Sequence, residues 1–147
     1  NSKIELIIIH YTALKNTLDA ISYLCNKEKK VSSHYLISQN GTVYNLVKDK
    51  FRAWHAGKSS FLGRVGCNDF SIGIEIEGTD FEKFNDAQYD TLGNLIISIK
   101  NFLPGLSAIT SHSFIAPGRK TDPGPYFDWN RVREAIETAK KNIFLFP

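Results

Sequence analysis

A short run of aliphatic and β-branched residues near the start of the chain restricts the possible folds more than any other feature. Residues 4–10 (IELIIIH) are almost continuously apolar and end on a histidine, His10. Such a run is typical of a strand that is buried on both faces, as in the parallel part of a layered sheet. We therefore expect a sheet with helices on both sides and His10 at the end of a buried strand.

Helical patterns follow at intervals along the chain. Apolar residues recur at helical spacing in residues 16–29 and 86–102, and the second pattern stops before Pro104. A closing helix is expected from about residue 129 to 142, with Asp128 as its N-cap.

Strand patterns fill the intervals between these helices. Residues 33–38 and 42–47 flank an Asn-Gly pair, which is the strongest short hairpin signal. Residues 71–77 alternate isoleucine with Ser, Gly and Glu, which predicts a strand with one buried face. Residues 107–111 predict another short strand, so strands and helices alternate as they do in α/β folds.

Size and charge narrow the class further. The 147 residues suit one domain over residues 1–147, an α/β fold with a mixed β-sheet flanked by helices. The net charge is only +3 with scattered Lys and Arg, so no nucleic-acid partner is expected. No apolar run approaches the roughly 20 residues of a transmembrane segment. Residues 51–68 show no sustained period and predict a long, irregular loop.

The histidines give the first indication of chemistry, because each lies at a predicted strand end or in a loop: His10, His34, His55 and His112. A catalytic zinc takes three protein ligands and leaves a fourth position open, with His and carboxylate as common donors. Two histidines and a carboxylate could form such a set. For any single histidine, a structural role is the alternative.

Asp122 is the best carboxylate candidate, since residues 117–125 are rich in Pro and Gly, which fix where its side chain points. The alternative is that Asp122 caps a turn before Pro123. Lys120 would place a cation where an oxyanion could form, although it could equally be an ordinary exposed lysine.

Further polar and aromatic residues could complete an active site. Glu75 and Glu77 point to the same face of their predicted strand, and a carboxylate beside a metal can act as a general base. A solvent-facing acidic pair is the alternative. In the long loop, Trp54, His55 and Phe61 could form a wall on which a sugar stacks, or could simply pack the loop.

Five ordered motifs carry a resemblance to a known family: residues 7–12 (IIIHYT), 31–37 (VSSHYLI), 53–57 (AWHAG), 67–80 (CNDFSIGIEIEGTD) and 112–129 with its RKTDPGP core. They cover nearly the whole chain. The chain resembles the type 2 N-acetylmuramoyl-L-alanine amidases of the AmpD-like branch, which are related to peptidoglycan recognition proteins and phage amidase lysozymes.

The resemblance implies a role for each of these side chains. His10, His112 and Asp122 would bind one zinc ion. Glu75 would activate the water and Lys120 would stabilise the tetrahedral intermediate. The substrate groove would be lined by three residues, His34, Trp54 and His55.

The implied activity is zinc-dependent hydrolysis of the amide between N-acetylmuramic acid, in its 1,6-anhydro form, and L-alanine, in bacterial cell-wall recycling or turnover. The partners would be anhydro-muropeptides or intact peptidoglycan. The protein would be a monomer or a weak dimer. The compartment is periplasm or cytoplasm, and Tyr11 favours the periplasmic branches. The alternatives are a peptidoglycan-binding module without activity and a structural zinc site closed by His34 or His55.

Two departures from the AmpD pattern bear on the substrate. The chain lacks the long insertion before the Ser-x-His motif, so a smaller lid could widen the choice of substrate. Gly66 stands where AmpD has a basic residue before Cys-Asn-Asp, and this removes one expected contact to the stem peptide.

Overall fold

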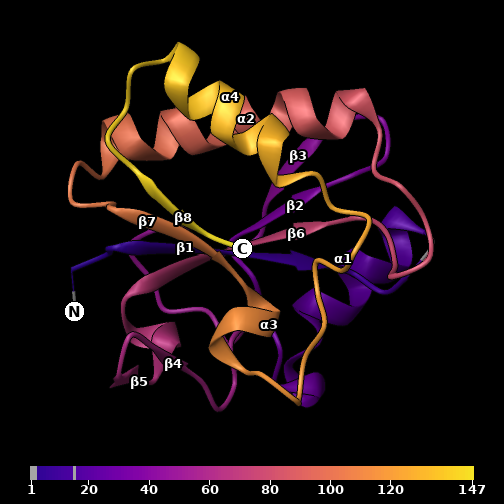
Figure 1. Ribbon diagram of the computed structural model, residues 1–147. Coiled ribbons are helices and arrows are strands. Elements are labelled where there is room, and N and C mark those ends of the chain that lie inside the picture. The colour runs from indigo at the N-terminus through magenta and orange to yellow at the C-terminus, as the bar shows by residue number, and fades with distance from the viewer. Residues whose placement is uncertain (1–2, 15) are drawn as a thin grey trace.

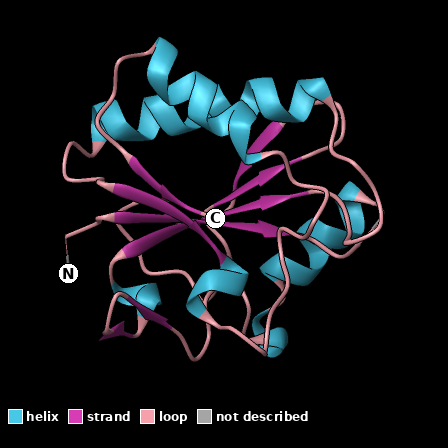
Figure 2. Cartoon of the chain, viewed as in Figure 1, coloured by secondary structure: helices cyan, strands magenta, loops and turns pink. Residues whose placement is uncertain are grey.

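The protein, seen in a computed structural model that describes residues 3–14 and 16–147, is built on a six-stranded mixed sheet (Figures 1 and 2). In chain order the strands of this sheet are β1 (Leu6–Tyr11), β2 (Tyr35–Ile37), β3 (Val43–Asn45), β6 (Ser71–Ile76), β7 (Ala108–Ser111) and β8 (Phe144–Phe146). Their order in space is β3-β2-β6-β1-β7-β8. Only β3 runs antiparallel to its neighbour, so the predicted α/β fold with a mixed sheet is confirmed.

Helices cover both faces of the sheet (Figure 1). One face carries α2 (Asp86–Phe102) and α4 (Trp129–Thr138). On the other side lie α1 (Thr17–Cys25), α3 (His112–Ile115), the hairpin of β4 (Ser60–Phe61) and β5 (Arg64–Val65), and the short 3-10 helices η1 (Lys27–Lys29) and η2 (Cys67–Asp69). Among the described residues, no helix is both long enough and apolar enough to cross a membrane.

Strand β1 divides the interior into two cores. Its side chains alternate between the faces, so Ile7 and Ile9 join the larger core with α2 and α4, whereas Ile8 joins a smaller core on the opposite side. His10 follows the parity of Ile8 and therefore points away from α2 and α4. The predicted burial of this strand on both faces is confirmed. The polar side chain of His10 lies on the side of the sheet that carries α1 and α3.

Helix α2 has the bounds that the sequence predicts, because both of its ends are encoded locally. Asn85 accepts a hydrogen bond from the backbone N–H of Gln88, and the Gln88 side chain accepts one from the Asn85 N–H, which completes a capping box. Pro104 follows the C-cap at Leu103. The buried face of the helix includes Leu92, which has no exposed surface.

Several segments differ from the sequence prediction. Residues 51–68 are not wholly irregular, since they contain the β4–β5 hairpin. Strand β6 is buried on both faces rather than one, because loops of the second layer cover the face expected to be exposed. The closing helix ends at Thr138 instead of residue 142, and Lys140 lies in the left-handed region with a φ of 55°. The short elements α3 and β8 were not expected.

Replacing a buried leucine should cost far more than replacing an exposed one. We expect Leu92→Ala to lower the free energy of unfolding by about 2–5 kcal/mol, since it leaves a cavity between sheet and helix. The matched change Leu18→Ala, at a side chain that is 73% exposed, should cost less than about 0.5 kcal/mol. Urea unfolding followed by circular dichroism measures both, and equal losses would contradict this account of the core.

Candidate active site

The topology brings polar residues from distant parts of the chain to one edge of the sheet. Strands β6, β1 and β7 are parallel, so their carboxyl ends lie together. The register pairs His10 with Glu75 and pairs Ile9 with Ser111. His112, the next residue after β7, is therefore placed beside His10. Ser111 also caps α3, because its side chain accepts from the Phe114 N–H.

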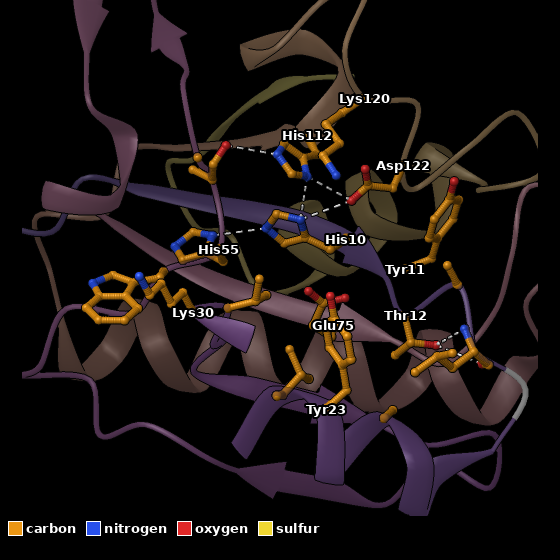
Figure 3. A pocket seen from close by; sticks show the side chains of 18 of the residues that line it. His10, Tyr11, Thr12, Tyr23, Lys30, His55, Glu75, His112, Lys120 and Asp122 are labelled. Carbon is orange, nitrogen blue, oxygen red and sulfur yellow. Dashed lines mark hydrogen bonds and ion pairs between the residues drawn. The ribbon is translucent and has the colours of Figure 1, made fainter. Parts of the chain in front are cut away.

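Three side chains converge there, and the two ring nitrogens and one carboxylate oxygen that face one another lie about 3 Å apart (Figure 3). His10 Nδ1 lies 2.9 Å from His112 Nδ1 and 3.0 Å from Asp122 Oδ2, and His112 Nδ1 lies 3.1 Å from the same oxygen. All three residues are buried, at 2%, 5% and 5% exposure. Within the described part of the chain, no other group of three His, Cys, Asp or Glu residues meets the geometry of a metal site.

The hydrogen-bond chemistry of this triangle fits a cation. His112 Nε2 lies 3.0 Å from the carbonyl oxygen of Ala56, which can only accept a hydrogen bond, so Nε2 carries a proton. In a neutral ring Nδ1 then has no proton and presents a lone pair. The Asp122 carboxyl lies within 3.1 Å of both rings, and an aspartate with its ordinary pKa is ionised at pH 7. Two acceptors thus face each other without a proton. A tetrahedral zinc would separate its ligand atoms by about 3.3 Å, close to the spacing observed.

The loop that carries Asp122 is fixed on both sides of this residue. Its carbonyl accepts from the Ser113 N–H at 3.1 Å, which ties the loop to α3. Next to it, the Thr121 hydroxyl donates to Asp80, and the Tyr11 hydroxyl donates to the same carboxylate oxygen. Asp80 is not predicted as a site residue from the sequence, although it ends the motif at residues 67–80.

Glu75 and Lys120 lie beside the triangle, on opposite sides of the contact between His10 and Asp122 in Figure 3. Burial raises the pKa of the Glu75 carboxyl well above its ordinary value, the negative charge of Asp122 adds to the rise, and Lys120 opposes it. Burial also lowers the pKa of His10 to about 4, so this ring is neutral at pH 7. Glu77, by contrast, accepts a hydrogen bond from the Thr17 hydroxyl and does not line the pocket that opens over the triangle.

A pocket of about 510 Å³ opens over the triangle. Trp54, which is 50% exposed, lines this pocket together with Glu75 and Lys120. Another part of the lining comes from α1 and the segment after it and includes Tyr23 and Lys30. The sequence predicts this segment only as a helix, because nothing in its apolar spacing indicates that one side borders a cavity.

The remaining predicted site residues are placed differently. His55 borders the pocket but is only 5% exposed, and it lies behind His10, with Nδ1 3.0 Å from His10 Nε2. His34 has no exposed surface and does not line the pocket: its Nε2–H donates to the Phe51 carbonyl and its Nδ1 accepts from the Gly73 N–H. Phe61 packs against Phe146 at a centroid distance of 5.1 Å, also away from the pocket. Substrate contacts by His34 and His55 stay predictions.

Comparisons with known proteins show the family to which the chain belongs. The family model described as N-acetylmuramoyl-L-alanine amidase matches residues 1–125. The 1,6-anhydro-N-acetylmuramyl-L-alanine amidase AmpD of Escherichia coli (strain K12) is 50% identical over 108 residues, which cover 73% of this chain and 59% of that protein. The chain thus matches less than two thirds of the length of such relatives.

Solved structures agree as well. A crystal structure of a selenomethionine AmpD derivative has a TM-score of 0.81 at 38% identity, covering 91% of this chain and 85% of that chain. The amidase AmiD from E. coli, solved with anhydro-N-acetylmuramic acid-L-Ala-D-γ-Glu-L-Lys, has a TM-score of 0.80 at 33% identity, covering 91% of this chain and 58% of that chain. The chain belongs to the N-acetylmuramoyl-L-alanine amidase family, among its AmpD-like type 2 members.

Proposed function

We propose that the chain is a zinc-dependent amidase that hydrolyses the bond between N-acetylmuramic acid and the L-alanine of a peptidoglycan stem peptide, and that residues 1–147 form one amidase domain. The observation that carries this proposal is the triangle of His10, His112 and Asp122 at the floor of an open pocket, with the buried carboxyl of Glu75 beside it.

His10 Nδ1, His112 Nδ1 and Asp122 Oδ2 would hold the metal. Three protein ligands with a pocket above them suit a catalytic site, since structural zinc sites are usually closed by a fourth protein ligand. His55 does not close this one, because its Nδ1 is hydrogen-bonded to the opposite nitrogen of His10 and its Nε2 to Ser71. When bound, zinc supplies a Lewis acid that polarises the scissile carbonyl and lowers the pKa of water toward about 7.

Glu75 has the properties of the group that moves the proton. Its burial raises its pKa, so the carboxylate binds a proton more readily than an exposed glutamate does. In hydrolysis Glu75 accepts a proton from the attacking water and returns it to the nitrogen of the leaving amine. Without this second transfer the amine would have to leave as an anion.

Lys120 is proposed to stabilise the charge that develops on the carbonyl oxygen. Its ammonium group lies at the same pocket and is near enough to Glu75 to oppose the rise in that carboxyl's pKa. A cation already in place where negative charge appears stabilises the transition state without reorganisation.

The pocket and the relatives support a muropeptide substrate. Trp54 presents a half-exposed aromatic face that suits a sugar ring. The AmpD relatives are named for 1,6-anhydro-N-acetylmuramyl-L-alanine, and AmiD was solved with an anhydromuramyl peptide. We infer the 1,6-anhydro form of the sugar for this chain, and hence a role in recycling or turnover of the cell wall.

Mass spectrometry tests the activity directly. Purified protein incubated with anhydro-muramyl tripeptide should release the free tripeptide. A chelator should abolish the release, and added zinc should restore it. Intact sacculi in a parallel incubation compare the two substrates. If zinc-loaded protein cleaves neither substrate but retains bound muropeptide, the chain is a binding module and the proposed activity is wrong.

Two substitutions should separate metal binding from proton transfer. Asp122→Ala removes a ligand, so zinc content and activity should be lost together. Glu75→Gln should keep zinc but lower kcat by about 10²–10⁴-fold, the range that a general acid–base group contributes. Glu77→Gln is the matched control, because Glu77 directly follows β6 but does not line the pocket, and it should keep both zinc and activity. Metal analysis with steady-state rates measures each variant, and full activity in Glu75→Gln contradicts the assignment.

A further inference from the structure

His55 stands out among the buried groups that the mechanism above does not use. Both ring nitrogens are occupied inside the protein, with Nδ1 3.0 Å from His10 Nε2 and Nε2 3.1 Å from the Ser71 hydroxyl. The ring therefore offers no free nitrogen to a substrate. It lies behind His10, on the side away from the triangle (Figure 3).

The direction of the hydrogen bonds can be assigned from the end of this chain. The Ser71 hydroxyl lies 2.6 Å from the carbonyl of Cys67, which has no proton to give, so Ser71 must donate to it. The serine has one proton, so it can only accept from His55, and the proton of the neutral His55 ring is on Nε2. His55 Nδ1 is then an acceptor, which receives Nε2–H of His10. Nδ1 of His10 is left as a lone pair that points at His112 and Asp122.

We propose that His55 is a positioning residue, which with Ser71 fixes the tautomer and orientation of His10 so that Nδ1 faces the metal. This inference rests on the metal site proposed above. Histidine ligands commonly donate their second N–H to a carbonyl or carboxylate, which sets the tautomer. Here a second histidine, His55, accepts that N–H. The Cys67 carbonyl fixes the direction of the hydrogen bond from Ser71, which in turn fixes the tautomer of His55.

The surroundings of His55 are built for the ring. A Cβ at Gly73 would lie 2.5 Å from His55 Cγ, so only glycine lets the imidazole lie against β6 at this position. The His55 N–H donates to Asn68 Oδ1 at 3.1 Å, which holds the backbone.

Zinc affinity, measured by competition with a chromophoric chelator, tests the role without reference to activity. His55→Leu should weaken zinc binding by about 10- to 100-fold, the range found for partners of metal ligands. His55→Asn places an amide oxygen near the position of Nδ1 and should recover most of this loss. Ser71→Ala should weaken binding by a smaller factor, since the ring can then change its tautomer.

Ser33→Ala is the matched control for Ser71→Ala. Each of these serines is buried and donates one hydrogen bond to a backbone carbonyl, Ser33 to Gly73 at 2.8 Å, but of the two only Ser71 is hydrogen-bonded to His55. Ser33→Ala should keep the wild-type affinity. If His55→Leu binds zinc as tightly as the wild type, or if Ser33→Ala weakens binding as much as Ser71→Ala, His55 has only a packing role.

Nitrogen-15 NMR of the zinc-free wild-type protein at pH 7.5 reads the tautomers themselves. The proton of His10 and that of His55 should both be found on Nε2, and a proton on Nδ1 of either neutral ring overturns the inference. This measurement also separates the metal site from the positioning role of His55. A wild-type protein that binds no zinc would refute the metal site, whereas the NMR result still tests whether His55 and Ser71 fix the tautomer of His10.

Discussion

The parallel pairing of β1 with β6 on one side and with β7 on the other is the constraint on which the rest of the structure depends. The alternation along β1 sends one set of isoleucines under α2 and α4 and sends His10 into the opposite layer. Because the three strands run in the same direction, the side chain of Glu75 on β6 and that of His112 after β7 lie at the same edge of the sheet as His10. The polar cluster is thus a product of strand direction and register.

The sequence predicts the elements whose signals are local. Helix α2 is an example, since its apolar stripe, its capping box and the following Pro104 lie within one short segment. The elements that it misses depend on distant partners: β8 has three residues and exists because it pairs with β7, and α3 is one short turn stabilised by Ser111 and by the loop of Asp122. Short strands and turns of this kind have too few residues for a period to be recognised.

The candidate site shows the same division. Residue type and motif order single out His10, His112 and Asp122, which the structure brings together. Spacing alone leaves Asp122 open between a turn cap and a ligand, whereas the structure shows its side-chain oxygen in contact with both rings. The resemblance implies substrate contacts for both His34 and His55, yet one is held by backbone groups and the other lies against His10. These partners are distant in the chain, so the residues around each histidine do not reveal them.

The separation of the converging residues along the chain links the site to folding. His10 lies 102 positions before His112 and 112 positions before Asp122. A chain still emerging from the ribosome therefore holds His10 without either partner until the next 102 residues have been added, and the triangle can close only after β7 has paired with β1. A cation bound by all three residues would recognise the finished fold and no earlier form. By mass action such a cation stabilises the whole native state, not one loop of it.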